Sequence, residues 1–472
     1  MLRLQKFIPS QHTLALVVAG FVSAFAFAPW DMWPLLLVCV GTLFYVLRLN
    51  TSVLKSLFYG LLFAWVFNLV NLWWVSAAFI QHAPVPEVKA IAYPAVVLMC
   101  LFLALPYAAM TGVFTLIQKI IPKHTLVLAI IFALLWTSVE LLRGTTIYGF
   151  PWNLLGYSLS PSLEMLQLAS ITTVFGLSLV VALSAALLAT LQPTLIGCAL
   201  ALLAGVWGYG SQRLKDAPIA PTQSHMFLVQ TTIPQPEKWD EALRAFSIQK
   251  YLELSALAEP GDVIVWPETA LTYDLTTNPM IREQLQQFLP YKASLVTGHP
   301  RYEPTADNVY HNSMTLLRND GTLGNSYDKH LLVPFGEFVP LRQYLSFLGE
   351  FATATFDYTA GTTPPQFDLE NGTTALPLIC YEAIFPFFVK QHLQDADLLL
   401  NITNDAWFAT THAPMQHFAL ARLRAIETGK PLVRLANSGI SAVLDGYGRI
   451  STLLNINESK GMRVSIPVGV DK

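Results

Sequence analysis

Three polar residues stand where apolar, strand-like runs of the sequence end. Glu268 follows the run 263–266, Lys329 closes the second strand of a predicted hairpin, and Cys380 ends the run 374–379. In α/β domains chemistry collects at strand ends, because the loops there are free while the sheet holds them rigidly. A carboxylate, an ammonium group and a thiol gathered at one sheet edge could perform acyl transfer.

The chemistry follows from the ordinary properties of a thiol. With a pKa of about 8.5, a thiol is a poor nucleophile at neutral pH until a base takes its proton or a positive charge stabilises the thiolate. Glu268 is the candidate base, Lys329 the candidate stabiliser of thiolate and oxyanion, and Cys380 the candidate nucleophile. The alternative is a surface glutamate, a surface lysine and a core cysteine that do not meet, since sequence separation does not establish proximity.

Cys380 differs in its surroundings from the other three cysteines. Cys39, Cys100 and Cys198 lie inside long apolar stretches, where cysteine behaves as a small buried hydrophobe. Cys380 lies in the polar half of the chain. The cysteine spacing contains no disulfide framework and no metal-type pair, so we predict neither a metal site nor a cofactor.

Charged residues are distributed very unevenly along the chain. Asp, Glu, Lys and Arg make up 12% of 472 residues, about half of the roughly 25% found in soluble domains. Only 12 of these 59 residues lie within 1–209. We therefore predict a membrane domain at 1–209, a linker at 210–222 and a water-soluble domain at 223–472. The net charge of −3 argues against nucleic-acid binding by bulk electrostatics.

The membrane half contains apolar runs that could span a bilayer, for which about 20 residues are needed. The first run follows Arg3 and Lys6 as in a signal peptide, but it continues directly into the next run, so we expect it to be retained. We predict seven spans, at 12–28, 32–48, 56–80, 90–118, 124–142, 166–190 and 193–209.

Lysines and arginines in the short loops between the spans predict their orientation. With a cytoplasmic N-terminus, six of these residues face the cytoplasm and two, Lys89 and Arg143, face the other side. An odd number of spans then places the soluble domain outside the cytoplasmic membrane. Only Gln192-Pro193 separates the last two runs, and a single span or a re-entrant pair there would reverse the side.

One loop of the membrane half is unusually aromatic. Glu140 and Arg143 can pair on one helix face just before it, and it contains Gly149-Phe150-Pro151-Trp152. Such a loop is either an aromatic belt that anchors helix ends or the rim of a lipid-facing pocket. Because one span would suffice as an anchor, the size of this half favours a role in holding a substrate.

The second half alternates strand-like and helix-like segments. Apolar runs buried on both faces, alternating with helices, indicate one layered α/β domain. Asn319-Asp320-Gly321 and Glu370-Asn371-Gly372 predict the turns of two hairpins. The predicted strands are 226–232, 263–266, 293–297, 314–317, 325–332, 367–369, 374–379, 398–402, 432–435 and 440–444, and the predicted helices are 240–257, 281–288 and 415–427.

The segments around the three polar residues resemble the catalytic segments of the nitrilase superfamily. They are Trp266-Pro267-Glu268, Tyr327-Asp328-Lys329 and Ile379-Cys380-Tyr381-Glu382. With the seven preceding spans, the chain resembles the bacterial apolipoprotein N-acyltransferase family. Further matching stretches are Arg143-Gly144, Gly149–Trp152, Lys238-Trp239-Asp240, Asn404–Phe408, Gln416-His417 and Asn437-Ser438-Gly439.

The resemblance implies an α-β-β-α sandwich on the periplasmic face of the bacterial inner membrane. It implies transfer of an acyl chain from a phospholipid, typically phosphatidylethanolamine, to the N-terminal diacylglyceryl-cysteine of an apolipoprotein. Glu268 would be the general base, Lys329 the oxyanion stabiliser and Cys380 the nucleophile. The family also relies on residues matching Trp239, Glu337, Tyr381 and Glu382, although packing roles for Trp239 and Tyr381 and a helix-start role for Glu382 stay open.

The chain departs from the family pattern in two places. Family members usually end with one more spanning helix. We expect that helix to be absent from this sequence, because residues 468–472 contain no apolar run. Ala409 stands where the family usually has glycine, and we expect a small effect. Two other functions stay open, a membrane-tethered amidase that uses water as acceptor and a non-catalytic scaffold or transporter, although the few charges in the spans argue against an ion pathway.

Overall fold

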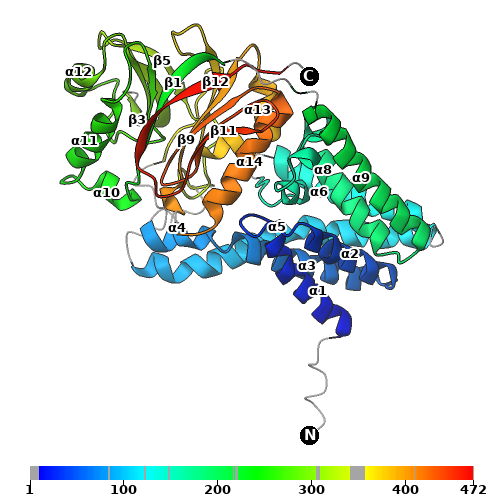
Figure 1. Ribbon diagram of the computed structural model, residues 1–472. Coiled ribbons are helices and arrows are strands. Elements are labelled where there is room, and N and C mark those ends of the chain that lie inside the picture. The colour runs from blue at the N-terminus through cyan, green and yellow to red at the C-terminus, as the bar shows by residue number, and fades with distance from the viewer. Residues whose placement is uncertain are drawn as a thin grey trace. The chain divides into compact units, whose positions relative to one another are not determined.

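A computed structural model describes residues 10–82, 86–121, 124–146, 149–215, 217, 222–304, 309–340, 357–408 and 410–470. Arg3, Lys6 and Ala409, which the sequence reasoning used, lie outside these residues, as does Lys123, one of the six residues predicted to face the cytoplasm. The chain divides into two compact units (Figure 1). The first comprises Met1–Ser76 and Ala90–Asp216, and the second comprises Ala77–Lys89 and Ala217–Lys472.

The described part of the first unit is helical. Its helices are α1 (Gln11–Val22), α2 (Pro34–Arg48), α3 (Val53–Leu72), α6 (Thr125–Thr145), α7 (Leu163–Leu166), α8 (Ala169–Leu188) and α9 (Pro193–Lys215), with 3-10 segments η2 (Ser23–Ala26) and η3 (Leu155–Leu159). Helices α4 (Val75–His82) and α5 (Pro86–Ile120) cross the division between the units.

Five of the described helices are long and apolar enough to cross a membrane. They are α3, the Lys89–Ile120 part of α5, α6, α8 and α9. The segments Gln11–Ala26 and Pro34–Arg48 are apolar but shorter. The predicted multi-pass helical membrane domain is therefore confirmed as a class, and the crossing by seven spans stays a prediction.

Helices α3 and α5 pack through small and hydroxyl-bearing residues. Thr111 Oγ1 donates to the Ser56 carbonyl at 2.8 Å, and Thr115 Oγ1 donates to Ser56 Oγ at 2.6 Å. A Cβ added at Gly60 would lie 2.2 Å from Thr111 Oγ1 and 2.9 Å from the Tyr107 carbonyl. Without a hydrophobic drive between helices in lipid, close backbone approach and polar contacts supply the association.

The aromatic loop of the first unit is held by the two charged residues that precede it. Glu140 Oε1 accepts hydrogen bonds from Trp136 Nε1 and the Leu155 amide, both at 2.9 Å. Arg143 donates to the carbonyls of Phe150 and Trp152 at 2.8 and 2.9 Å. Both side chains are buried, so they satisfy loop backbone groups that could not reach water.

The second unit contains two six-stranded sheets. The order of the first sheet is β12-β1-β2-β3-β4-β5, and that of the second is β11-β10-β9-β8-β7-β6. The strands are β1 (Thr222–Gln230), β2 (Val263–Val265), β3 (Ser294–Glu303), β4 (Val309–Leu317), β5 (Leu323–Asp328), β6 (Phe367–Asp368), β7 (Thr374–Ile379), β8 (Leu398–Asn404), β9 (Leu432–Asn437), β10 (Ser441–Leu444), β11 (Ile450–Leu454) and β12 (Lys460–Pro467).

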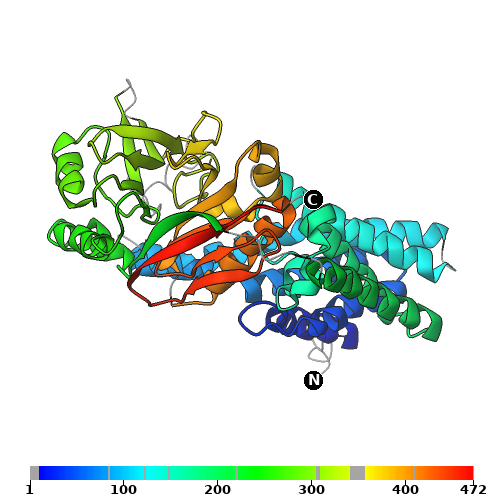
Figure 2. The same ribbon diagram turned by 45° about the horizontal axis from the view of Figure 1, so that its top comes forward.

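The sheets face each other across one core, and helices cover the outer faces. Apolar residues of both sheets, including Val265 and Ile379, form the central cluster. A second cluster joins α11 (Arg244–Ser255) and α12 (Pro279–Phe288) to the first sheet, and a third joins α13 (Pro386–His392) and α14 (Ala413–Thr428) to the second. The predicted α-β-β-α sandwich is therefore confirmed (Figure 2).

Strand direction brings the three candidate residues to matching strand ends. Strands β1, β2 and β3 are parallel, as are β7, β8 and β9. Two antiparallel pairings, β3 with β4 and β4 with β5, return β5 to the direction of β2. Glu268 after β2, Lys329 after β5 and Cys380 after β7 therefore all follow the carboxyl ends of their strands.

Candidate active site

Glu268 lies in a loop that leaves β2 and packs tightly against β3. Its Oε1 accepts hydrogen bonds from Asn312 Nδ2 at 2.8 Å and Lys329 Nζ at 3.4 Å. Its Oε2 accepts one from the Asn404 amide at 2.9 Å, at the end of β8. A Cβ at Gly298 would lie 2.7 Å from the Glu268 Cα, so glycine is required for the loop to pass there.

Lys329 is buried between two carboxylates. Its Nζ donates to Glu337 Oε1 at 2.9 Å, and only 1% of its side chain is exposed. Burial alone would lower the pKa of this ammonium group, but the charges of Glu337, Glu268 and Cys380 outweigh it and hold the pKa well above its usual value. Lys329 therefore keeps its positive charge throughout the physiological pH range.

Glu337 completes the charged cluster from the loop after β5. Its Oε1 accepts from both Lys329 Nζ and Asn312 Nδ2, the latter at 2.7 Å, and its Oε2 accepts from the Val333 amide at 2.8 Å. The single amide group of Asn312 thus bridges the two carboxylates. Sequence reasoning missed Asn312, because β4 contains four polar residues and nothing in the sequence shows which of them faces the site.

Cys380 directly follows β7 and is the first residue of the 3-10 segment η5 (Cys380–Ile384). Its φ of 51° lies in the left-handed region that few residues other than glycine adopt. Burial of the thiolate and the charge of Glu268 raise the pKa of the Cys380 thiol. The charge of Lys329 and a hydrogen bond with the Thr403 side chain oppose this rise only in part, so the pKa stays above its usual value. The resting thiol is therefore protonated, and Glu268 and Lys329 are close enough to act on its ionisation.

Tyr381 and Glu382 continue the turn that begins at Cys380. The Tyr381 ring packs edge-on against Phe385, with ring centroids 4.9 Å apart. Glu382 Oε1 accepts from Tyr327 Oη and the His330 amide, both at 2.7 Å, and Oε2 accepts from the Ile379 amide at 2.7 Å. This fully buried carboxylate joins the turn of Cys380 to the strand end that carries Lys329.

Trp239 and its neighbour Lys238 lie at the end of α10 (Gln235–Trp239). Trp239 is 37% exposed, whereas Lys238 is buried with its Nζ 3.4 Å from the Glu268 carbonyl and 3.3 Å from that of Thr269. Burial lowers the pKa of Lys238 to about 7, against the opposing charge of Glu268. Sequence reasoning selected Trp239 and passed over Lys238, because nothing in the sequence distinguishes a buried lysine from an exposed one.

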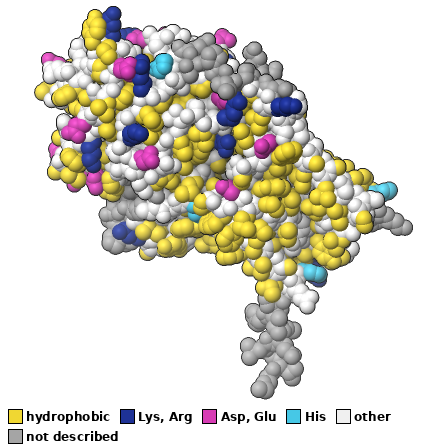
Figure 3. All heavy atoms as spheres, in the orientation of Figure 1, with side chains coloured by type: hydrophobic (Ala, Val, Ile, Leu, Met, Phe, Trp, Pro, Cys, Tyr) yellow, Lys and Arg dark blue, Asp and Glu magenta, His cyan; other side chains and the backbone are white. Residues whose placement is uncertain are grey.

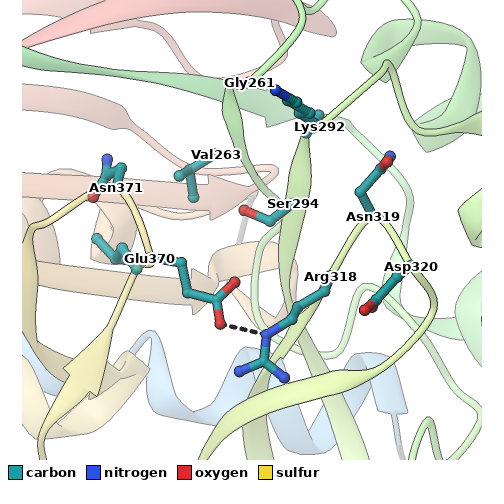
Figure 4. A pocket seen from close by; sticks show the side chains of 11 residues that line it. Gly261, Val263, Lys292, Ser294, Arg318, Asn319, Asp320, Glu370 and Asn371 are labelled. Atoms are coloured by element: carbon teal, nitrogen blue, oxygen red, sulfur yellow. Dashed lines mark hydrogen bonds and ion pairs between the residues drawn. The ribbon is translucent and has the colours of Figure 1, made fainter.

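The described residues contain no group of three or more His, Cys, Asp and Glu side chains placed to hold a metal ion. They do contain an open depression of about 380 Å³ in the second unit (Figure 4). Its lining includes Val263 and Ser294, the first residues of β2 and β3, and Arg318 pairs there with Glu370. It therefore lies at the strand ends opposite to those that carry Glu268, away from the candidate site.

Two family models match the two halves of this chain. The family model described as the apolipoprotein N-acyltransferase N-terminal domain matches residues 19–187, and that described as carbon-nitrogen hydrolase matches residues 228–466. A protein named apolipoprotein N-acyltransferase from Allorhizobium ampelinum is 35% identical over 95% of this chain and 88% of its own length. The chain belongs to the apolipoprotein N-acyltransferase family.

Further relatives extend the match. A protein of the same name from Brucella melitensis is 34% identical over 95% of this chain and 85% of its own length. Among solved structures, Saccharomyces cerevisiae Nit3, a member of branch 10 of the nitrilase superfamily, aligns with 53% of this chain and 92% of its own, at 17% identity and a TM-score of 0.38. Assignment to the N-acyltransferase family rests on the family models and the relatives.

Proposed function

We propose that this chain moves an acyl chain from a phospholipid to the N-terminal diacylglyceryl-cysteine amine of apolipoproteins, through a thioester on Cys380. The observation that carries the proposal is the buried cluster of Glu268, Lys329 and Glu337, in which the charges of Glu268 and Lys329 act on the Cys380 thiol and Glu337 pairs with Lys329. It stands in a chain of the N-acyltransferase family that also has five helices of spanning length among its described residues.

In the first half-reaction, the Cys380 thiol becomes a nucleophile and attacks the phospholipid ester. Glu268 takes the thiol proton, and the sulfur forms a bond to the ester carbonyl carbon. Lys329, which stays protonated, stabilises the oxyanion of the tetrahedral intermediate. The ester C–O bond then breaks, and the lysophospholipid alkoxide leaves with the proton that Glu268 returns.

In the second half-reaction, the lipoprotein amine replaces the lysophospholipid. The neutral amine attacks the thioester carbon, Glu268 accepts the proton that the nitrogen loses, and the C–S bond breaks to release the Cys380 thiolate, which is reprotonated. Glu337 holds Lys329 in place by its 2.9 Å ion pair during both steps. The product carries an amide in place of the thioester.

The donor and acceptor in this proposal are phosphatidylethanolamine and a diacylglyceryl apolipoprotein. Trp239, Leu243 and Phe246 expose 37, 38 and 55% of their surface along α10 and the segment into α11. Apolar side chains left exposed beside the loop of Glu268 suit contact with acyl chains. We place the second unit on the periplasmic side of the inner membrane, with the N-terminus in the cytoplasm, from the distribution of loop lysines and arginines.

Intact-protein mass spectrometry tests the thioester. The full chain in detergent, incubated with phosphatidylethanolamine, should gain one acyl mass on the peptide that contains Cys380, with release of one lysophospholipid. Cys380→Ser and Cys380→Ala should gain no thioester mass, whereas Cys198→Ala, which removes an exposed cysteine, should behave as wild type. A wild-type protein that releases no lysophospholipid and carries no adduct contradicts the proposal.

The match of residues 228–466 to the carbon-nitrogen hydrolase model favours one second candidate, a membrane-tethered amidase. In that reaction water takes the place of the lipoprotein amine as the acceptor. Ammonia release from a small amide without any lipid, together with no acyl transfer to a diacylglyceryl-cysteine peptide, would support the amidase. Transfer to the peptide without ammonia release supports the acyltransferase.

A further inference from the structure

A buried charged cluster that the proposed mechanism does not use lies behind the turn of Cys380. It consists of His417 on α14, Asp405 at the start of η6 (Asp405–Trp407) and Arg434 on β9. Side-chain exposures of these residues are 6, 1 and 0%. Buried charges are costly unless they are paired, so such a cluster needs a reason beyond packing.

The imidazole of His417 connects this cluster to the backbone of Cys380. Its Nε2 lies 3.3 Å from the Cys380 carbonyl oxygen, and its Nδ1 lies 2.9 Å from Asp405 Oδ1. With φ at 51°, the Cys380 backbone departs both from the extended conformation of β7 before it and from the ordinary 3-10 conformation of the segment that it begins. A hydrogen bond to the carbonyl of the turning residue is a direct means of holding that conformation.

The imidazole ring of His417 is held in place by Asp405 and by Arg434. Arg434 Nη2 lies 2.9 Å from Asp405 Oδ2 and 3.2 Å from His417 Nδ1. Arg434 Nη1 donates to Asn401 Oδ1 at 2.5 Å, and Asn401 Nδ2 donates to the Leu378 carbonyl at 3.0 Å. The cluster therefore links α14 to β8 and to the end of β7, the strand that delivers Cys380.

Close packing around Asp405 leaves this arrangement little room to shift. A Cβ at Gly439 would lie 2.2 Å from Asp405 Oδ2, so only glycine fits there. Thr403 Oγ1 donates to Asp405 Oδ1 at 3.4 Å and its side chain also contacts the Cys380 thiol. The carboxylate that orients the ring is thus coupled to the thiol through a second path.

We propose that His417 is the positioning residue of Cys380, with an N–H at Nε2 that holds the Cys380 carbonyl and so presents the thiol to Glu268 and Lys329. The imidazolium form supplies this hydrogen while its Nδ1–H donates to Asp405 Oδ1, and the neutral Nε2–H tautomer supplies it while Nδ1 accepts from Arg434 Nη2. The neutral Nδ1–H tautomer instead turns a lone pair toward the carbonyl. This inference rests on the proposed function in one respect, because it takes Cys380 as the nucleophile.

Two amide substitutions separate the roles of the ring nitrogens. In His417→Gln the side-chain amide nitrogen can reach the place of Nε2, whereas in His417→Asn it reaches only that of Nδ1. The full chain in detergent is tested in two ways: by the alkylation rate of the Cys380 peptide with iodoacetamide, and by single-turnover thioester formation at saturating phosphatidylethanolamine. His299→Gln is the matched control, a buried histidine whose ring lies 3.1 Å from the Pro300 carbonyl.

Wild type, His299→Gln and His417→Gln should have similar rates of alkylation and of thioester formation. His417→Asn should be slower, by about 10²-fold in thioester formation, because a misplaced reacting group costs about this much in rate. The KM for phospholipid and the melting temperature should not change between the Gln and Asn variants. Equal rates for His417→Gln and His417→Asn, whether both fast or both slow, overturn the assignment. If neither variant folds, the Asp405→Asn variant is tested instead and should slow alkylation of Cys380. An unchanged alkylation rate in Asp405→Asn also overturns the assignment.

The two readouts distinguish the failure of this inference from the failure of the proposed function. Iodoacetamide needs neither phospholipid nor lipoprotein, so its rate reports only how the thiol is presented. If the wild type forms no thioester while the alkylation order holds, the acyl donor is wrong and the role of His417 stands. If thioester forms and the order fails, the role of His417 is wrong.

Discussion

Asn312 gives the candidate site its shape at the scale of single residues. One amide group donates to Glu268 and Glu337, which would otherwise repel each other across Lys329. Like charges this close must share donors or one must be protonated. The backbone carbonyl of Asn312 also accepts a hydrogen bond from the Lys329 amide at 2.9 Å, so Asn312 holds the backbone of Lys329 and, through its side chain, the two carboxylates that pair with Lys329 Nζ.

Replacing Asn312 by Leu should slow acylation of Cys380 far more than it weakens phospholipid binding. The change removes the shared donor and lets the carboxylates move apart, which we expect to lower the single-turnover rate by about 10²-fold with little change in KM. Lysophospholipid release at saturating donor measures the rate. Asn319→Ala, at the β4–β5 turn and away from the site, is the control; an N312L rate equal to it would contradict the bridging role.

Glu382 should make the stability of the fold depend on pH. Burial raises its pKa to about 7 from 4.5, although the Ile379 amide, the Tyr327 hydroxyl and other donors lower it. A carboxyl with a raised folded-state pKa binds its proton more tightly when folded, so its contribution is complete below pH 4.5 and is lost as the pH rises through 7. The shift from 4.5 to about 7 corresponds to about 3 kcal/mol.

Thermal unfolding of wild type and Glu382→Gln from pH 5 to 8, followed by tryptophan fluorescence, measures this effect. The wild-type melting temperature should fall relative to that of E382Q as the pH rises, because glutamine cannot titrate. The absolute stability of E382Q is not the readout, since its amide hydrogens face hydrogen-bond donors. Two parallel profiles would show that Glu382 does not change its charge in this range.

At the residue scale, the reacting groups could be predicted from the sequence, whereas the residues that hold them in place could not. Glu268, Lys329 and Cys380 could be chosen because each follows an apolar run, and the chemistry of their side chains is complementary. Asn312 lies inside a strand, where only the register with β3 and β5 decides what it faces. Lys238 is buried by tertiary packing, which overrides the usual exposure of lysine.

At the scale of elements, strands with continuous apolar sequence were predictable, whereas the last two strands of the chain, β11 and β12, were not. Strand β8 is buried at every residue and matches its predicted run closely. Strand β12 contains Lys460 and Arg463, has only two buried residues among its eight, and pairs with β1 more than two hundred residues earlier. Nothing local predicts such a long-range pairing, which depends on the antiparallel return of the chain (Figure 1).

Helix packing in the first unit should be sensitive to single methyl groups. Gly60→Ala places a Cβ 2.2 Å from Thr111 Oγ1 and should separate α3 from α5, lowering the melting temperature of the detergent-solubilised protein by several degrees. Gly205→Ala on α9 meets nothing within 4 Å and is the control, with an unchanged or slightly higher melting temperature. Equal effects of the two changes would contradict close α3–α5 packing.

At the scale of the whole molecule, the surface follows the bipartite sequence. Figure 3 shows charged side chains over the second unit, whereas hydrophobic side chains dominate the helices of the first. Exposed residues of the first unit include Val38, Leu98 and Ile171, each with more than 60% of its surface accessible. Such residues would be unfavourable in water and are typical of a lipid-facing surface.

The proposed orientation can be measured in intact cells with a membrane-impermeant maleimide. In a background that carries both Cys198→Ala and Cys380→Ala, and so lacks the exposed and the half-buried native cysteine, Asn371→Cys in the β6–β7 turn should be labelled from outside the inner membrane, because the second unit is proposed to be periplasmic. Thr51→Cys, between α2 and α3, should be labelled only after the cells are opened. The reverse pattern would place the second unit in the cytoplasm and invert the proposed orientation, whereas labelling of both residues from the same side would contradict the predicted number of crossings.

Glu382 links the two sheets at the point where chemistry is proposed. Tyr327 belongs to β5 of the first sheet, and Ile379 belongs to β7 of the second. In a β-sandwich, local unfolding can separate the two sheets. Here the Glu382 carboxylate is hydrogen-bonded to both sheets and opposes their separation. The amides of Ile379 and His330 should therefore exchange with deuterated solvent only when the entire domain unfolds. The turn of Cys380 and the strand end that carries Lys329 would then be among the last parts of the sandwich to unfold locally.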